Sequence, residues 1–151
     1  MIINPFDKFG VNAEQSRSIK NIKAKIFYAV AVGISIFLLF VVITFSWISY
    51  EVKNQCLSAQ REYSGNCVES LISLLDDENK SYRSRNDAIW TLGQLADKHA
   101  LPVLKSYYTG NIPPREPLSE TISQYELKKA IQWCETGNVT SWMYVNRDTW
   151  Y

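Results

Sequence analysis

Few residues of this 151-residue chain have the types and spacing that catalysis requires. Nucleophilic catalysis needs a base beside the nucleophile, and the one histidine, His99, stands at the end of a predicted helix, where its charge meets the helix dipole favourably. Asp76, Asp77 and Glu78 offer paired carboxylates, but they lie in a predicted turn, where solvated side chains are the simpler interpretation. With no Walker loop, GxGxxG or CxxC motif, the sequence predicts a protein that is not an enzyme, binds no cofactor and has no identified small-molecule substrate.

The three cysteines indicate disulfide chemistry more readily than metal binding. Cys56 and Cys67 bracket a short polar loop that contains Gly65, which makes them candidates for a hairpin-like disulfide. Pairing of Cys134 with either of them is an alternative, and buried free thiols are the remaining interpretation. A Cys/His metal site is not expected in a chain with a single histidine.

Residues 26–50, IFYAVAVGISIFLLFVVITFSWISY, carry no charge. As a helix that rises about 1.5 Å per residue they would span roughly 37 Å, which exceeds a hydrocarbon core of about 30 Å. A cleaved signal peptide has a shorter apolar region that ends at a small-x-small site, whereas this run ends in Trp47-Ile48-Ser49-Tyr50. We therefore expect a cytoplasmic tail at residues 1–17 and a single transmembrane helix, with its flanks, at 18–52.

The charges on either side of this run predict its orientation. Residues 1–25 have a net charge of +3, and residues 51–151 have a net charge of −2. Because basic residues favour the cytoplasmic side of a membrane helix, we expect the N-terminus in the cytoplasm and a periplasmic, or otherwise extracytoplasmic, C-terminal domain on the inner (cytoplasmic) membrane. The mildly acidic domain argues against nucleic acid as a partner, which leaves the lipid bilayer and other membrane proteins.

A linker or disulfide loop is expected at residues 53–66, and a helical domain at 67–137. As an alternative for the first part of the loop, Glu51 to Gln60 continue the helix past the membrane surface and the turn Ser64-Gly65-Asn66 ends it. Apolar residues at helical spacing predict helices from about Cys67, over roughly 82–98, from about 100 to 110, and from about 119 to 137. Ser119 or Ser123 is the expected N-cap of the last helix. Gly93 lies inside a predicted helix, where a close helix contact that excludes a side chain would account for it. The predicted fold class is all-α.

A series of motifs across residues 68–107 falls in a specific order. The motifs are Leu74-Leu75, the acidic turn Asp76-Asp77, Arg83 and Arg85 early in the next helix, Leu92-Gly93 within it, and Leu101-Pro102 after it. This order resembles a HEAT repeat of the short bacterial type. The resemblance implies about two helical hairpins stacked side by side, a binding scaffold in a bacterial host, and an ion pair between Arg83 or Arg85 and Asp76, Asp77 or a further carboxylate. The second repeat departs from the pattern, because the proline-rich loop 111–119 replaces its turn and its second helix has no Leu-Gly.

Residues 138–151 form an aromatic tail with five candidate interaction residues: Trp142, Met143, Tyr144, Trp150 and Tyr151. The alternation of Trp142 and Tyr144 favours a short strand or an extended segment over the last helix. Two repeats are fewer than a solenoid usually needs, so the tail either caps the domain or binds a partner. The sequence predicts a non-catalytic, membrane-anchored accessory or scaffold subunit of a larger membrane complex; the alternative is a free-standing anchored adaptor or sensor that recruits a soluble extracytoplasmic protein.

Overall fold

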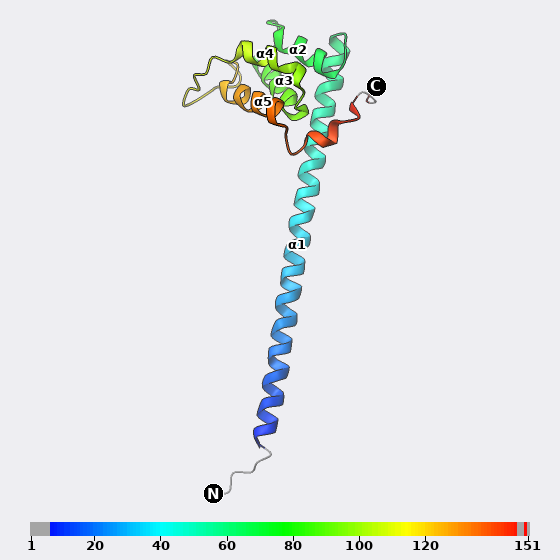
Figure 1. The fold of residues 1–151 in the computed structure, drawn as a ribbon, viewed down its shortest axis with the longest axis vertical. Helices are drawn as coiled ribbons and strands as arrows, with labels where there is room; N and C mark the ends of the chain where they lie inside the picture. The colour runs from blue at the N-terminus through cyan, green and yellow to red at the C-terminus, as the bar shows by residue number, and fades with distance from the viewer. Residues whose placement is uncertain (1–6, 148–149, 151) are drawn as a thin grey trace. The chain divides into compact units, whose positions relative to one another are not determined.

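The computed structural model describes residues 7–147 and 150, with side chains from residue 21 onward, and every regular element in that part of the chain is helical (Figure 1). The expected all-α fold class is therefore confirmed for the described residues. The chain divides into two units, Met1–Thr44 and Phe45–Tyr151. The second unit is called the helical domain below.

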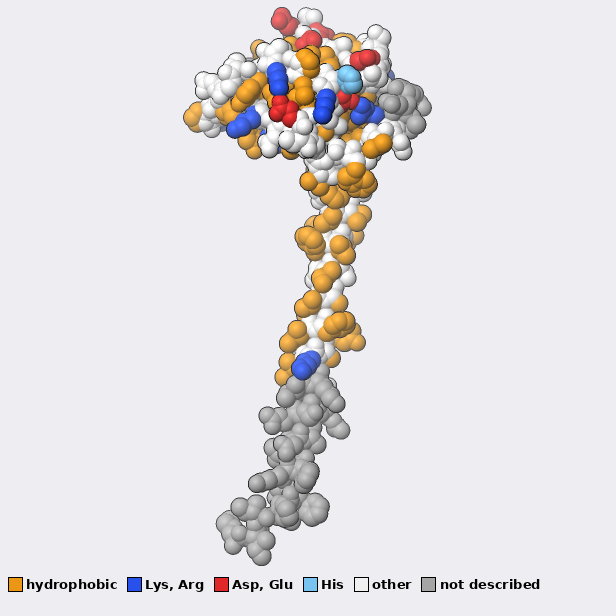
Figure 2. All heavy atoms as spheres, viewed as in Figure 1, with side chains coloured by type: hydrophobic (Ala, Val, Ile, Leu, Met, Phe, Trp, Pro, Cys, Tyr) orange, Lys and Arg blue, Asp and Glu red, His pale blue; other side chains and the backbone are white. Residues whose placement is uncertain are grey.

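Helix α1 (Asp7–Glu62) starts before residue 18 and continues well past residue 52. Within the first unit it exposes large apolar side chains, among them Phe37 at 66% and Phe40 at 65%. Figure 2 shows orange, hydrophobic side chains along this segment, with white backbone atoms between them. The helix is long and apolar enough to cross a membrane, as the uncharged run 26–50 predicts.

The end of α1 belongs to the helical domain, which corrects the expected linker at residues 53–66. Val52, Cys56 and Ala59 recur at helical spacing and are at most 2% exposed in the domain core. No helix-breaking residue interrupts this face before Gly65, so α1 runs to Glu62 and only residues 63–66 form a loop. Ile48 and Tyr63 extend the same face and pack partly buried against the core.

Helices α2 (Cys67–Asp76) and α3 (Tyr82–Leu95) are joined by the short connection 77–81 and pack against each other. A capping box starts α2: the backbone N–H of Glu69 donates to Asn66 Oδ1 at 3.1 Å, and the Asn66 N–H donates to Glu69 Oε2 at 2.9 Å. Ser81 caps α3 by accepting from the Ser84 N–H at 3.2 Å. Helix α3 ends before the expected residue 98, because Ala96 adopts a left-handed conformation with φ of 52°.

The remaining elements are η1 (Lys98–Ala100), α4 (Leu101–Tyr107), α5 (Gln124–Thr136) and η2 (Ser141–Tyr144). Helix α5 packs against α3 and α4. A Cβ atom at Gly93 of α3 would lie 2.9 Å from Ala130 Cα and 3.0 Å from Trp133 Cε3, both in α5. The expectation that Gly93 marks a close helix contact is confirmed, since a side chain there would collide with the backbone of α5.

The long connection 108–123 between α4 and α5 is held by Asn86 of α3, by its own Glu116, and by Gln124, whose Oε1 accepts from the Thr109 N–H at 2.8 Å. Asn86, which is 4% exposed, donates to the carbonyls of Leu118 and Thr121 and accepts from the Ser123 N–H. Glu116 accepts from Ser123 Oγ at 2.5 Å and from the Gln124 N–H at 2.8 Å. Of the two expected caps, Ser123 is the one that caps α5, by accepting from the Glu126 N–H at 3.1 Å.

Candidate interaction surface

The aromatic tail begins as the 3₁₀-helix η2, so the expected strand or extended segment at Trp142 and Tyr144 is wrong. A 3₁₀-helix has three residues per turn, and its residues i and i+3 lie above one another. Tyr144 and Arg147 therefore share one direction, while Trp142 and Val145 share another. A strand, with a period of two residues, would instead have placed Trp142 and Tyr144 on the same side of the tail.

The inward side of the tail is fixed to the domain by several contacts. Thr140 Oγ1 and Asn138 Nδ2 donate to Gln94 Oε1 at 2.8 and 3.1 Å. Tyr144 is fully buried in the core, and the Trp150 ring packs edge-on against it with ring centroids 6.1 Å apart. Burial is the main cause that raises the pKa of Tyr144 above its ordinary value. This part of the tail caps the domain.

The outward side of the tail carries exposed apolar side chains. Val139 and Val145 are each 75% exposed and Trp142 is 68% exposed, and the three recur at a spacing of three. We call these three residues the tail ridge. Of the other candidate interaction residues, Met143 packs partly buried against the core, and Tyr151 lies outside the described residues. The structure thus separates the candidates into capping residues and one exposed tryptophan.

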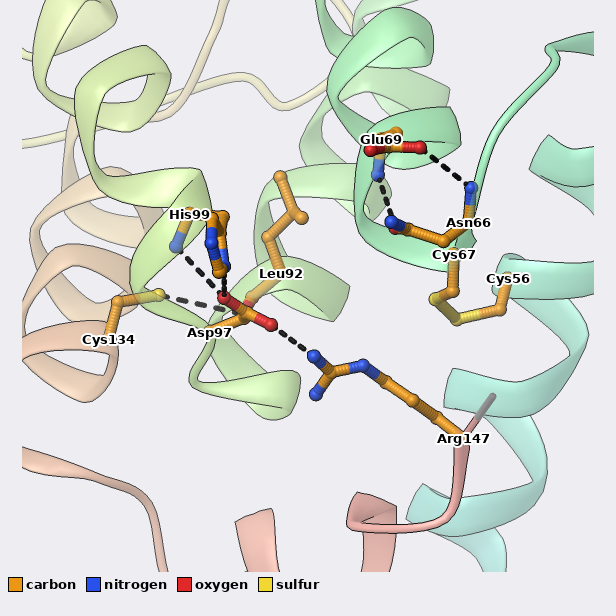
Figure 3. A network of polar contacts seen from close by, with 9 residues as sticks. All are labelled: Cys56, Asn66, Cys67, Glu69, Leu92, Asp97, His99, Cys134 and Arg147. Atoms are coloured by element: carbon orange, nitrogen blue, oxygen red, sulfur yellow. Dashed lines mark hydrogen bonds and ion pairs between the residues drawn. A yellow bond between two sulfur atoms is a disulfide. The ribbon is translucent and has the colours of Figure 1, made fainter. Parts of the chain in front are cut away.

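Asp97 joins the tail to the α3–α4 connection (Figure 3). Its Oδ1 accepts from the His99 backbone N–H at 2.9 Å and lies 2.7 Å from His99 Nδ1, while its Oδ2 pairs with the Arg147 guanidinium. Burial raises the pKa of Asp97, but the hydrogen bonds from His99 and the charge of Arg147 outweigh it and hold the pKa below its ordinary value. The His99 side chain is 90% exposed, and it contacts Asp97 at the start of η1.

The ion pairs of Arg83 or Arg85 with Asp76 or Asp77, expected from the repeat resemblance, do not form among the described residues. Arg85 Nε donates to the Leu75 carbonyl at 2.8 Å, and the guanidinium lies 5.8 Å from the ring centroids of Tyr82 and Tyr107. Asp76 and Asp77 instead accept from the hydroxyls of Tyr107 and Tyr63, at 2.9 and 2.7 Å. Arg83 is exposed beside Asp87, and its charge acts to lower the pKa of that carboxyl. Arg85 donates to a carbonyl at the end of α2, and one tyrosine hydroxyl donates to each of Asp76 and Asp77.

Cys56 and Cys67 form a disulfide with a Cα–Cα distance of 5.0 Å, which joins the end of α1 to the start of α2. Cys134 is a free thiol buried in α5, and its Sγ lies 3.7 Å from the Leu92 carbonyl oxygen to which it donates (Figure 3). Burial raises the pKa of the Cys134 thiol to about 12. A thiol with so high a pKa is protonated near neutral pH and is a poor nucleophile and metal ligand.

No group of three or more His, Cys, Asp or Glu side chains is placed to hold a metal ion within the described part of the chain. Comparison with family models, with curated proteins and with solved structures finds no match to this chain.

Proposed function

We propose that this protein is a non-catalytic, single-pass subunit of a larger membrane complex, anchored by α1 with its N-terminus in the cytoplasm. The charge-free run 26–50 supports the anchor, and the basic residues before it support the orientation. The Cys56–Cys67 disulfide supports the same orientation independently, because disulfides persist in oxidising compartments such as the periplasm.

The helical domain serves as the scaffold of this subunit, and we propose a HEAT-like stack of two hairpins. The short connection between α2 and α3 and the packing of α5 against α3 and α4 support this arrangement. The buried face at the end of α1 and the buried Tyr144 supply apolar surface on which a short stack depends for stability.

The tail ridge is the surface through which the domain contacts its partner. The observation that carries this proposal is the exposure of Trp142 on a segment whose neighbouring aromatic residues are buried or half-buried. Tryptophan dominates the binding energy of many interfaces when a partner covers it. Since the capping contacts fix this segment, Trp142 is presented with little conformational freedom to lose on binding.

The function is tested by solubilising native membranes in a mild detergent, purifying the tagged full chain and identifying the proteins that accompany it by mass. A defined set of integral membrane proteins at fixed stoichiometry is expected for the wild type. The Trp142→Ala variant is expected to retain about tenfold less of that set. Tyr125→Ala removes an aromatic side chain that is 53% exposed on α5 and serves as the matched control.

Recovery of a lone 17.4-kDa chain, or of a homo-oligomer, would contradict the subunit proposal. A salt-sensitive, substoichiometric soluble partner would favour the anchored adaptor instead. Orientation is measured separately with a membrane-impermeant maleimide on cells whose outer barrier is opened. Lys128→Cys, at an exposed position on α5, is expected to react, whereas Lys23→Cys is expected to stay unlabelled until the membrane is dissolved.

A further inference from the structure

The helical domain contains an apolar hollow where α1 passes α3. Its volume is about 240 Å³, and Trp47, Ile48, Glu51 and Trp90 line it. Trp47 and Glu51 stand one helical turn apart on α1, and Trp90 faces them from α3. Trp47 is 71% exposed and Trp90 is half-buried, so the two indole rings are open to a ligand from outside.

Negative charge lies at this hollow. The Glu51 carboxylate is part-buried and accepts a hydrogen bond from Gln55 Nε2 at 3.2 Å, which leaves its second oxygen available. Asp87, one turn before Trp90 on α3, lines a different pocket; burial is the main cause that raises its pKa, Arg83 lowers it, and the charge of Glu51 raises it. Two tryptophan rings beside a carboxylate form an arrangement that attracts an ammonium group, through the ring faces as well as through the ion pair.

The position of the hollow along the chain indicates where its ligand comes from. Trp47 and Ile48 belong to the charge-free run 26–50, and Glu51 is the first charged residue after it. Tryptophan at the end of a membrane-spanning segment lies at the level of the lipid headgroups. Trp90 lines the same hollow as Trp47, so it reaches that level as well.

We propose that the Trp47–Trp90 hollow binds the ammonium headgroup of a membrane phospholipid, with Glu51 as the counter-charge. The proposal rests on the proposed membrane anchor, because only a spanning α1 brings the hollow to the headgroup layer. A lysine of a partner protein has the same ammonium chemistry. Phospholipid is favoured because Trp47 and Ile48, which line the hollow, belong to the apolar run 26–50 that lipid would surround.

The test uses the full chain in nanodiscs that contain equal amounts of phosphatidylethanolamine and of the same lipid with its amine acetylated. The acyl chains are identical; acetylation replaces the ammonium group by a neutral amide and leaves the headgroup with the negative charge of its phosphate. Native mass spectrometry after release from the disc counts the lipids that stay bound. We expect the amine lipid to be retained in about three- to tenfold excess; equal retention would overturn the proposal.

Two variants locate the binding. Glu51→Gln keeps the shape of the hollow and removes its charge, and Trp90→Leu keeps it apolar and removes one ring; both are expected to bring the excess close to one. Tyr125→Leu removes an exposed aromatic ring outside the hollow and is expected to keep the excess. An unchanged excess in Glu51→Gln, or a loss in Tyr125→Leu equal to that in Trp90→Leu, would contradict the assignment.

A vesicle flotation assay tests the membrane anchor separately from the headgroup site. Wild-type protein that does not float with vesicles after an alkaline wash would contradict the membrane anchor. Protein that floats but shows no preference between the two lipids would contradict only the headgroup site. Far-UV circular dichroism of each variant confirms that a lost preference does not come from an unfolded domain.

Discussion

The two connections that join paired helices are held in place by different kinds of hydrogen bonds. The α2–α3 connection, residues 77–81, is short, and the side chains of Asp77 and Ser81 satisfy backbone N–H groups within it and at the start of α3. The α4–α5 connection, residues 108–123, is long, and it depends on Asn86 from α3 and on its own Glu116. A short turn distributes its stability over local contacts, whereas a long loop concentrates it in a few side chains that reach across.

Asn86→Ala is expected to give the largest effect on the stability of the domain. It removes three hydrogen bonds at a position that is 4% exposed and leaves the Leu118 and Thr121 carbonyls and the Ser123 N–H without this partner. We expect a loss of about 2–4 kcal/mol in the free energy of unfolding, measured by denaturant titration in detergent. Asn79→Ala, in the exposed short connection, is the control and should cost far less. Equal losses would remove the contrast between the connections.

Gly93→Ala tests the contact where the two hairpins meet. The new methyl group would lie 2.9 Å from the Ala130 backbone, so α3 and α5 must separate. The collision is expected to cost about 1–3 kcal/mol, less the roughly 1 kcal/mol that alanine gains over glycine in a helix. The melting temperature would fall. A rise in melting temperature would mean that the helices move apart freely.

Glu116→Gln tests the second fastening of the long loop. The carboxylate accepts from Ser123 Oγ and from backbone N–H groups at the start of α5, and its charge is also favourable there. We expect a loss of about 1–2 kcal/mol and faster amide exchange at the first turn of α5. Glu120→Gln, in the same loop and exposed, is the matched control. Equal exchange in both variants would show that Glu116 does not hold the helix start.

The smallest expected effect is a change in the titration of Tyr63, whose hydroxyl donates to Asp77 in the α2–α3 connection. The hydrogen bond to Asp77 is the main cause that raises the pKa of Tyr63 to about 12. Asp77→Asn should bring the tyrosine titration, followed at 295 nm, toward the ordinary value of about 10. Because the raised pKa favours the protonated hydroxyl, this contribution to stability is full below about pH 10 and is lost as the pH rises through 12. An unchanged titration would place the cause of the shift elsewhere.

Local features could be predicted from the sequence, and contacts across the fold could not. The close approach at Gly93 and a cap at Ser123 were expected because each depends on a residue type at a helical position. The continuation of the membrane helix to about residue 60 was expected, but the burial of Val52, Cys56 and Ala59 in the domain core was not, because it depends on the helices that pack against them. No local sequence pattern indicates the hydrogen bonds by which Asn86 holds the α4–α5 connection, since its partners lie 32 to 37 residues away.

The threefold spacing of the tail limits how its length can change. An insertion of one residue between Thr140 and Tyr144 would turn everything after it by about 120° around η2. Tyr144 would leave the core and turn to the outward side of the tail ridge, and Met143 or the inserted residue would take its place. Insertions or deletions in this segment are therefore expected to be tolerated only in multiples of three residues, because three residues complete one turn of a 3₁₀-helix.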